Sequence, residues 1–260
     1  MSTNRLPIHS RCLTGLLLAA ALCPGPGRIV LAEGAEESAH PPAPTWKHVR
    51  VDREGGFVEI ETAVIRQKVV EGEWLELVAC AAGGPEHESV LVTKARPSHV
   101  HLALLLLGLE PGTPMAWKLD GDRIVVAREA SGPRLAVTAH YERDGEPVVE
   151  GVHGWIVNRR TERALADNIW LFTGSRFHEF DGRKSYLADM AGTILSLVQF
   201  GDEVLARPTK LTRENDDEAW TADRKRVPPK GTRVLLRLTP VPEAKPESAP
   251  SDAKPEANDE

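Results

Sequence analysis

Cysteine is scarce in this sequence, and the short motifs that mark common cofactor-binding and nucleotide-binding proteins are missing. The 260 residues include three cysteines, and two of them, Cys12 and Cys23, lie in an apolar stretch near the N-terminus. There is no C-x-x-C-H haem motif, no P-loop and no Gly-rich dinucleotide fingerprint, which excludes the protein classes defined by those motifs. No repeat with a period of about 20 to 50 residues is visible.

Positive charge is also in short supply. Asp and Glu outnumber Lys and Arg by 38 to 32, and the net charge is −6. The densest basic group, at 224–226, lies close to an acidic run at 214–218. No basic face is therefore available to neutralise phosphates, and we expect no nucleic-acid partner.

The N-terminus has the pattern of an export signal. Basic residues precede the apolar run Cys12–Cys23, which is too short to cross a bilayer, since a spanning helix needs about 20 apolar residues. Small residues follow, and we predict a signal peptide over residues 1–32 with cleavage after Ala32. The mature protein would be exported to the periplasm or cell envelope and would have no transmembrane helix. Acylation at Cys23 is the alternative, although the bulky Leu22 before it fits a lipoprotein signal poorly.

Both flanks of the remaining chain lack the apolar residues that a core requires. Residues 33–45 are acidic and rich in Pro and Ala, and residues 242–260 are an acidic Pro/Ala/Glu tract. Neither segment can bury enough apolar surface to offset the conformational entropy that it would lose on folding. We therefore predict a disordered linker and a disordered tail. Residues 46–241 are long enough to bury a core, and we expect them to form a single domain.

Within that domain, short alternating or β-branched runs predict strands. They cover residues 56–65, 73–80, 89–94, 115–119, 123–127, 134–142 and 147–152, with further runs from 168, 193 and 233. One run differs, because it is rich in Leu and Ala, begins at Pro97 and stops at Gly108. It is apolar on all sides, which predicts a buried helix over about 97–107. We therefore expect an α+β fold, mostly antiparallel strands around one buried helix.

One stretch, CAAGGPEHESVLVTKARPSHVHLALLLLG (Cys80–Gly108), carries an ordered string of Cys, His, Glu and Ser residues. It resembles the YdjY-domain proteins, exported proteins found notably in planctomycete-type bacteria, in its C-x-x-G-G/T-x-E-H-E-S…P-S-H-x-H-x-A-L-L-L-L-G pattern. The similarity continues more weakly through most of the predicted domain. The resemblance implies an exported protein and assigns no activity, ligand or cofactor. The positions that match the motif are Cys80, Glu86, His87, Glu88, Ser89, Pro97, Ser98, His99 and His101.

A metal or small-ligand site is the sharpest hypothesis for this stretch. Thiolate and imidazole ligands from Cys80, His87, His99 and His101 would suit zinc or copper. Residues two apart on a helix point about 200° apart, so His99 and His101 are not both expected to reach one ion. The sequence leaves the presence and identity of a metal open.

Two other interpretations compete with it. In the first, Cys80 is a small buried apolar residue, Glu86 and Glu88 are solvated turn residues, and Ser98 caps the helix. The protein would then be a non-catalytic structural or interaction module of the cell envelope. In the second, Cys80 or Ser89 is the nucleophile of a hydrolase with a nearby histidine as base. No G-x-S-x-G elbow supports that interpretation.

Overall fold

The computed structural model describes residues 46–66, 74–211 and 220–242. The predicted signal peptide, linker and tail and the acidic run at 214–218 lie outside these residues, apart from the first residue of the tail. The elements in chain order are β1 (Val49–Asp52), β2 (Phe57–Val64), β3 (Leu77–Ala81), η1 (Glu86–Glu88), β4 (Ser89–Thr93), α1 (Pro97–Leu106), β5 (Ala116–Asp120), β6 (Arg123–Arg128), β7 (Arg134–Arg143), β8 (Glu146–Gly151), η2 (Val152–Trp155), β9 (Ile156–Asn158), β10 (Trp170–Phe172), β11 (Phe177–Phe180), β12 (Arg183–Tyr186), α2 (Leu187–Ala191), β13 (Thr193–Ser196), β14 (Leu205–Ala206), β15 (Trp220–Ala222) and β16 (Arg233–Pro240).

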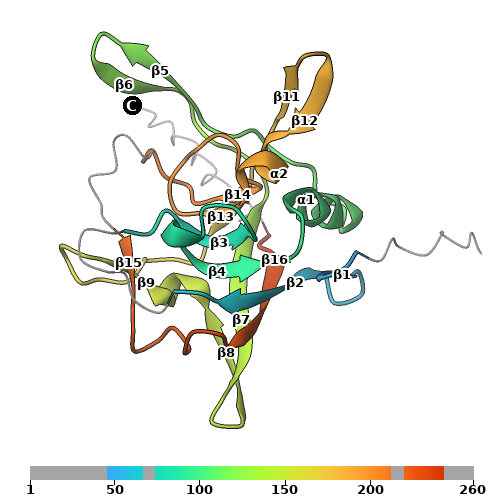
Figure 1. Ribbon diagram of the computed structural model, residues 1–260, viewed down its shortest axis with the longest axis vertical. Coiled ribbons are helices and arrows are strands. Elements are labelled where there is room, and N and C mark those ends of the chain that lie inside the picture. The colour runs from blue at the N-terminus through green and yellow to red at the C-terminus, as the bar shows by residue number, and fades with distance from the viewer. Residues whose placement is uncertain (1–45, 67–73, 212–219, 243–260) are drawn as a thin grey trace, which may run out of the picture. The chain divides into compact units, whose positions relative to one another are not determined.

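The main sheet closes on itself (Figure 1). Its strands follow the order β2, β16, β7, β10, β14, β13, β3 and β4, and β4 pairs back with β2 through Val92 and Leu91. β1 is added beside β2, and β8 beside β7. The interior is filled by strand side chains such as Ile60, Leu236 and Trp170, all of which are fully buried.

The expectation of an α+β fold around a buried helix is wrong, because the protein is mostly β. α1 begins at Pro97 as predicted, but it lies beside β1, β2 and β13 and not inside the sheet. A closed sheet of eight strands has an interior just wide enough for its own side chains, which leaves no room for a helix. Only one side of α1 is therefore covered, and its buried residues are Pro97, Val100, Ala103 and Leu104.

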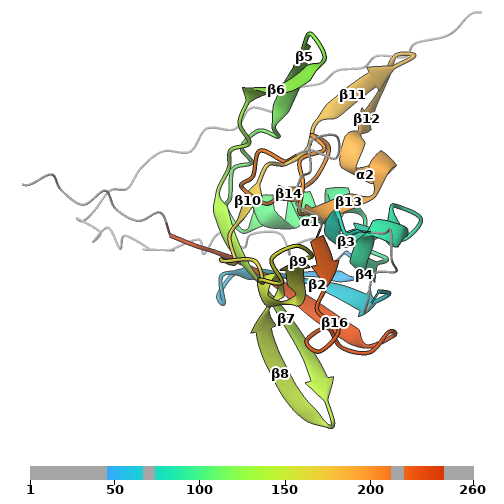
Figure 2. The ribbon, with the colours of Figure 1, turned by 90° about the vertical axis from the view of Figure 1, so that its left-hand side faces the viewer.

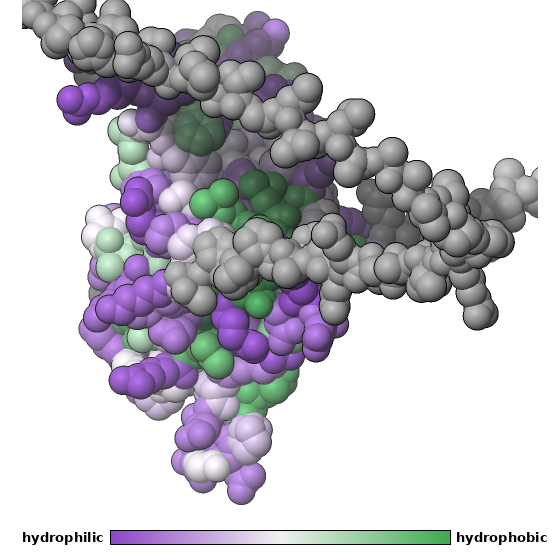
Figure 3. Space-filling model, turned by 90° about the vertical axis from the view of Figure 1, so that its right-hand side faces the viewer, coloured by the Kyte–Doolittle hydropathy of each residue, from purple (hydrophilic) through white to green (hydrophobic). Residues whose placement is uncertain are grey.

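The opposite side of α1 is exposed even though its residues are apolar. Leu102 and Leu105 are 43% and 39% exposed. Figure 3 shows apolar side chains gathered in the middle of the face on which α1 lies. No helix in the described part of the chain is long and apolar enough to span a membrane.

β3 and β4 are neighbours in the sheet and run parallel. The link between them, 82–88, must therefore return along the whole length of β3 before β4 begins. Parallel connections usually take a dozen or more residues, and this shorter link suffices because both strands have only five residues. η1 lies in this link, so the Gly-Gly turn and His87 stand at the edge of the closed sheet.

Three hairpins extend from the closed sheet (Figure 2). β5–β6 and β11–β12 form separate two-stranded sheets, and the far ends of β7 and β8 form the third hairpin. Their outward side chains include Leu119, Val149 and Phe177, which are 67%, 61% and 67% exposed. These hairpins enlarge the exposed surface of the protein and contribute little to its hydrophobic core.

Candidate functional site

Cys80, the residue around which the metal hypothesis is built, lies in the interior. It is fully buried on β3, and its Sγ atom lies 3.8 Å from the carbonyl oxygen of Leu91. Burial raises the pKa of its thiol to about 11, a rise that a hydrogen bond with Ser89 partly offsets. Metal ligation and nucleophilic attack both need the thiolate, and this environment disfavours it.

Glu86 and His87 of η1 are exposed, whereas the Glu88 side chain is only 16% exposed and is not the solvated turn residue that the sequence suggested. The His87 side chain is 73% exposed, and its Nε2 atom lies 3.3 Å from Oε1 of Glu88. Glu86 holds the preceding turn, because its Oε1 atom accepts the backbone N–H of Gly83 at 2.9 Å. The Cys80 side chain therefore points into the core, whereas the His87 side chain points into solvent.

The two serines of the motif have structural partners. Ser89 is fully buried, and its hydroxyl donates to the carbonyl of Leu91 at 2.8 Å. Ser98 does not cap its own helix, because Arg96 occupies the N-cap position. Its backbone N–H and hydroxyl instead donate to the two carboxylate oxygens of Asp189 on α2, each at 2.8 Å. Neither serine has a histidine among its partners in the part of the chain that the structure describes.

His99 and His101 point in different directions from the first turns of α1. The His99 ring stacks on Trp46, with 5.7 Å between ring centroids. The His101 ring packs edge-on against Phe172, and its Nδ1 atom lies 2.8 Å from the hydroxyl of Tyr186. Burial lowers the pKa of His101. Both rings pack α1 against neighbouring parts of the chain.

The structure therefore does not bring the proposed metal ligands together. Within residues 46–66, 74–211 and 220–242, no three His, Cys, Asp or Glu side chains lie close enough to hold one metal ion. The same separation removes the histidine that a Cys80 or Ser89 nucleophile would need.

A groove lies on the outer face of the closed sheet. It has a volume of about 1000 Å³ and is lined by side chains from β2, β4, β7 and β16 together with Ala82 and Glu86 of the β3–β4 link. Small-molecule sites commonly have volumes of about 300–1000 Å³. A second hollow of about 320 Å³ shares His48, Glu61 and Leu235 with the groove.

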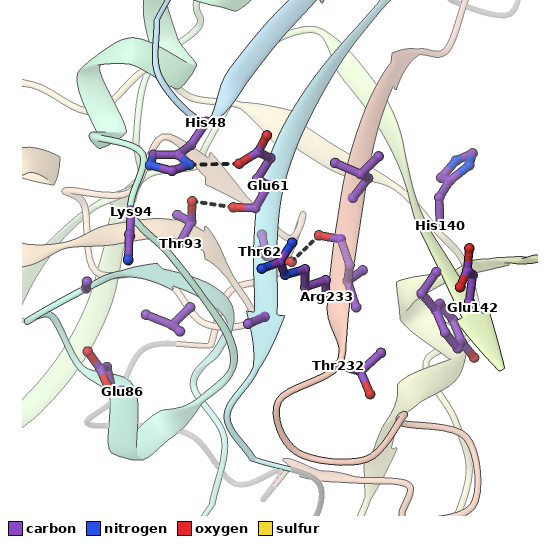
Figure 4. Close-up of a pocket in the computed structure, with 16 residues that line it drawn as sticks. His48, Glu61, Thr62, Glu86, Thr93, Lys94, His140, Glu142, Thr232 and Arg233 are labelled. Carbon is purple, nitrogen blue, oxygen red and sulfur yellow. Dashed lines mark hydrogen bonds and ion pairs between the residues drawn. The ribbon is translucent and has the colours of Figure 1, made fainter. Parts of the chain in front are cut away.

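Strand register explains the shape of the groove floor. Val92, Ala63 and Arg233 form one cross-strand row, and Glu61, Leu235 and His140 form the next. Neighbouring residues on each strand, such as Val64 and Leu236, point into the core and are buried. Ala63 has the smallest side chain of its row and lies between Val92 on β4 and Arg233 on β16. Figure 4 shows Glu61, Lys94 and Arg233 among the side chains of the groove.

His48 and Glu61 form a fixed pair at one end of the groove. The Nδ1 atom of His48 donates to Oε2 of Glu61 at 2.8 Å, and the Glu61 backbone N–H donates to the His48 carbonyl at 3.0 Å. Thr93 adds a third restraint, because its hydroxyl donates to the Glu61 carbonyl at 2.6 Å. His48 has a φ of 71°, a left-handed conformation that is uncommon outside glycine. This pair joins β2 and β4 to the chain segment before β1.

Lys94 and Arg233 line the groove. Both are exposed, and neither forms an ion pair with any described residue. Other cations of the same face differ, since Arg50 and Arg237 both bind Glu59, at 2.7 Å and 2.8 Å. The groove therefore combines an apolar floor with two cations whose hydrogen-bonding capacity is unused.

Sequence reasoning missed most of the groove. Its residues span positions 48 to 235, and their proximity depends on the pairing of β2 with both β4 and β16. The one local signal is the alternation of polar with apolar residues along β2, where Glu59 and Glu61 face outward. Glu86 is the one residue among the named motif-matching positions that also lines the groove.

Comparison with known proteins identifies one related family. A family model described as the YdjY domain matches residues 49–239, and the resemblance predicted from the sequence is confirmed over that range. No curated protein and no solved structure matches the chain.

Proposed function

The chain belongs to the YdjY domain family, and we propose that its domain binds a small ligand non-covalently in the groove on the outer face of the closed sheet. The observation that carries this proposal is the hollow of about 1000 Å³ that four strands and the β3–β4 link build together. Its floor is formed by Ala63, Val92 and Leu235, and polar side chains stand around it. Apolar side chains that contact a ligand and polar groups that fix its orientation are both features of ligand sites.

The proposal keeps the part of the sequence hypothesis that concerns a ligand beside the Cys80–His87 turn and moves the binding groups. Glu86 of that turn lines the groove, whereas Cys80 faces the core. A metal site built on Cys80 would have to expose a buried thiol and bring separate histidines together. Ligand binding in the groove needs neither change.

The groove can be tested by filling its floor. Ala63→Trp places an indole on the floor and is expected to weaken binding at least tenfold, because the side chain occupies the ligand volume. Amide chemical shifts recorded against a library of small polar and aromatic fragments would give the affinity and the location. Leu119→Trp, on an exposed position of the β5–β6 hairpin, is the matched control and should leave binding unchanged.

Two outcomes would contradict the proposal. Fragments that bind and shift amides elsewhere, with Ala63, Val92 and Leu235 undisturbed, would move the site. Equal affinity in folded Ala63→Trp and unsubstituted protein would show that the groove floor is not in contact with the ligand.

Export is the second part of the proposal. The support for it is the basic segment, short apolar run and small residues before Ala32 in the sequence. We expect the mature protein, isolated from cells that carry the full-length gene, to begin at Glu33, which the intact mass would reveal. A mass that retains residues 1–32, or a mass increase consistent with acylation at Cys23, would overturn cleavage after Ala32.

A further inference from the structure

We infer that the groove selects ligands that carry an oxyanion, a carboxylate or a phosphate, held between Lys94 and Arg233. This inference rests on the proposed ligand-binding function and specifies the chemical class of the ligand. It follows from where these two cations stand and from what surrounds them.

The strand register sets the two cations on either side of a gap. Arg233 pairs with Ala63, and Ala63 pairs with Val92, so Arg233 and Val92 are two strands apart, about 10 Å at the usual strand spacing. Lys94 follows Val92 by two residues and lines the same groove. The methyl group of Ala63 leaves the space between them open, and both long side chains can reach across it.

No carboxylate of the groove lining forms an ion pair with Lys94 or Arg233 among the described residues. Glu61 is bound by His48 at 2.8 Å, and one oxygen of Glu86 accepts the Gly83 N–H at 2.9 Å. Glu142, an exposed residue of β7, is the third carboxylate in the lining and forms no ion pair within the described residues. Lys94 and Arg233 are therefore the cations of this face that remain available to a ligand.

Arginine and lysine together suit an oxyanion better than a neutral group. The planar guanidinium of Arg233 can donate two parallel hydrogen bonds to one carboxylate or phosphate, and the ammonium of Lys94 adds a point charge. The apolar part of such a ligand would lie over Val92 and Leu235, which are partly exposed on the floor. The site therefore fits a compact ligand with one anionic end and one apolar end.

The experiment compares charged and neutral probes of the same shape. Phenylacetate and phenyl phosphate are titrated into the protein beside phenylacetamide, and the amide shifts of Ala63, Val92 and Leu235 are followed. We expect the anions to bind at least tenfold more tightly than the amide and the affinity to fall as salt is added. The ratio of the two anions distinguishes a carboxylate ligand from a phosphate ligand.

The cations are tested by neutralising them. The double variant Lys94→Gln/Arg233→Gln is expected to lose about tenfold or more in affinity for the anions and to keep its affinity for phenylacetamide. Lys118→Gln/Arg123→Gln, on the exposed β5–β6 hairpin, removes the same charges away from the groove and should change neither affinity.

The outcomes distinguish an error in the ligand class from an error in the location of the ligand site. If phenylacetamide binds in the groove as well as phenylacetate, or if the Lys94/Arg233 variant binds both equally, the oxyanion class is wrong and the groove remains a ligand site. If none of the three probes shifts the groove amides, the oxyanion site is overturned, and the fragment library then decides whether the groove binds any ligand.

Discussion

Replacing Phe172 with alanine is expected to lower the free energy of unfolding by about 3–5 kcal/mol. Phe172 is fully buried at the end of β10, and its ring lies 5.0 Å from the His101 ring of α1. Its carbonyl also accepts the backbone N–H of Gly112 at 2.9 Å, which fixes the segment after α1. The substitution would leave a cavity where the closed sheet, α1 and that segment meet. Urea unfolding followed by tryptophan fluorescence would measure the loss.

A second phenylalanine provides the control. Phe177, on the β11–β12 hairpin, is 67% exposed, so Phe177→Ala should change stability by less than about 0.5 kcal/mol. Hydrogen exchange of α1 should accelerate in the Phe172 variant and not in the control. A loss below about 1 kcal/mol for Phe172→Ala would mean that α1 does not depend on β10 for its attachment.

Glu203 is expected to make the stability of the protein fall as pH rises. It is fully buried, and its Oε2 atom accepts the backbone N–H groups of Phe200, Gly201 and Asp202 at 3.1, 2.8 and 3.1 Å. Its Oε1 atom has no partner among the described residues. Burial raises the pKa of Glu203 from 4.5 to about 7, and the backbone hydrogen bonds offset part of that rise.

The sign follows from which state holds the proton more tightly. Between about pH 4.5 and 7 the folded protein keeps the Glu203 proton and the unfolded chain has lost it, so the contribution present at low pH disappears as pH rises. The loss is about 3 kcal/mol over this window. Glu203→Gln should remove that part of the pH dependence, because an amide does not titrate.

Urea unfolding at pH 5 and pH 8 would measure the effect of Glu203. Glu129→Gln is the matched control, because the Glu129 side chain is exposed and pairs with Lys210 at the surface. Its pH dependence should match that of the unsubstituted protein within about 0.5 kcal/mol. An unchanged pH dependence in Glu203→Gln would contradict the assignment of a raised pKa to this residue.

Much of the local structure could be predicted from the sequence. Apolar and β-branched runs predicted strands that correspond to β2, β3, β4, β7 and β16, and Pro97 marked the start of α1. These features depend on residues close together in the chain. Closure of the sheet could not be predicted in the same way, because it depends on pairs such as Ala63 with Val92 and Leu236 with Ile60.

The misplacement of α1 has the same origin. A helix that is apolar on all sides is normally buried, and the sequence carried no information about what would cover it. The strands bury their own apolar residues by closing, and Leu102 and Leu105 are left at the surface. Composition alone does not distinguish a helix that lies inside a core from one that lies against it.

The structure separates the side chains that the sequence grouped into one candidate site. Cys80 and His87 are near each other in sequence, but β3 carries Cys80 into the core and η1 carries His87 into solvent. The groove residues Lys94, Arg233 and His140 come from three strands that are distant in sequence. Glu86 was selected for its place in a motif, and it lines the groove.

The position of β16 has a consequence for the time at which the protein can fold. β16 is the last described strand, and it lies between β2, one of the first, and β7. Until residues 233–240 have been synthesised, nothing joins β2 to β7, and the sheet stays open. Contacts between such distant parts of a chain form slowly. The closed sheet therefore forms only after almost all of the described chain has been synthesised.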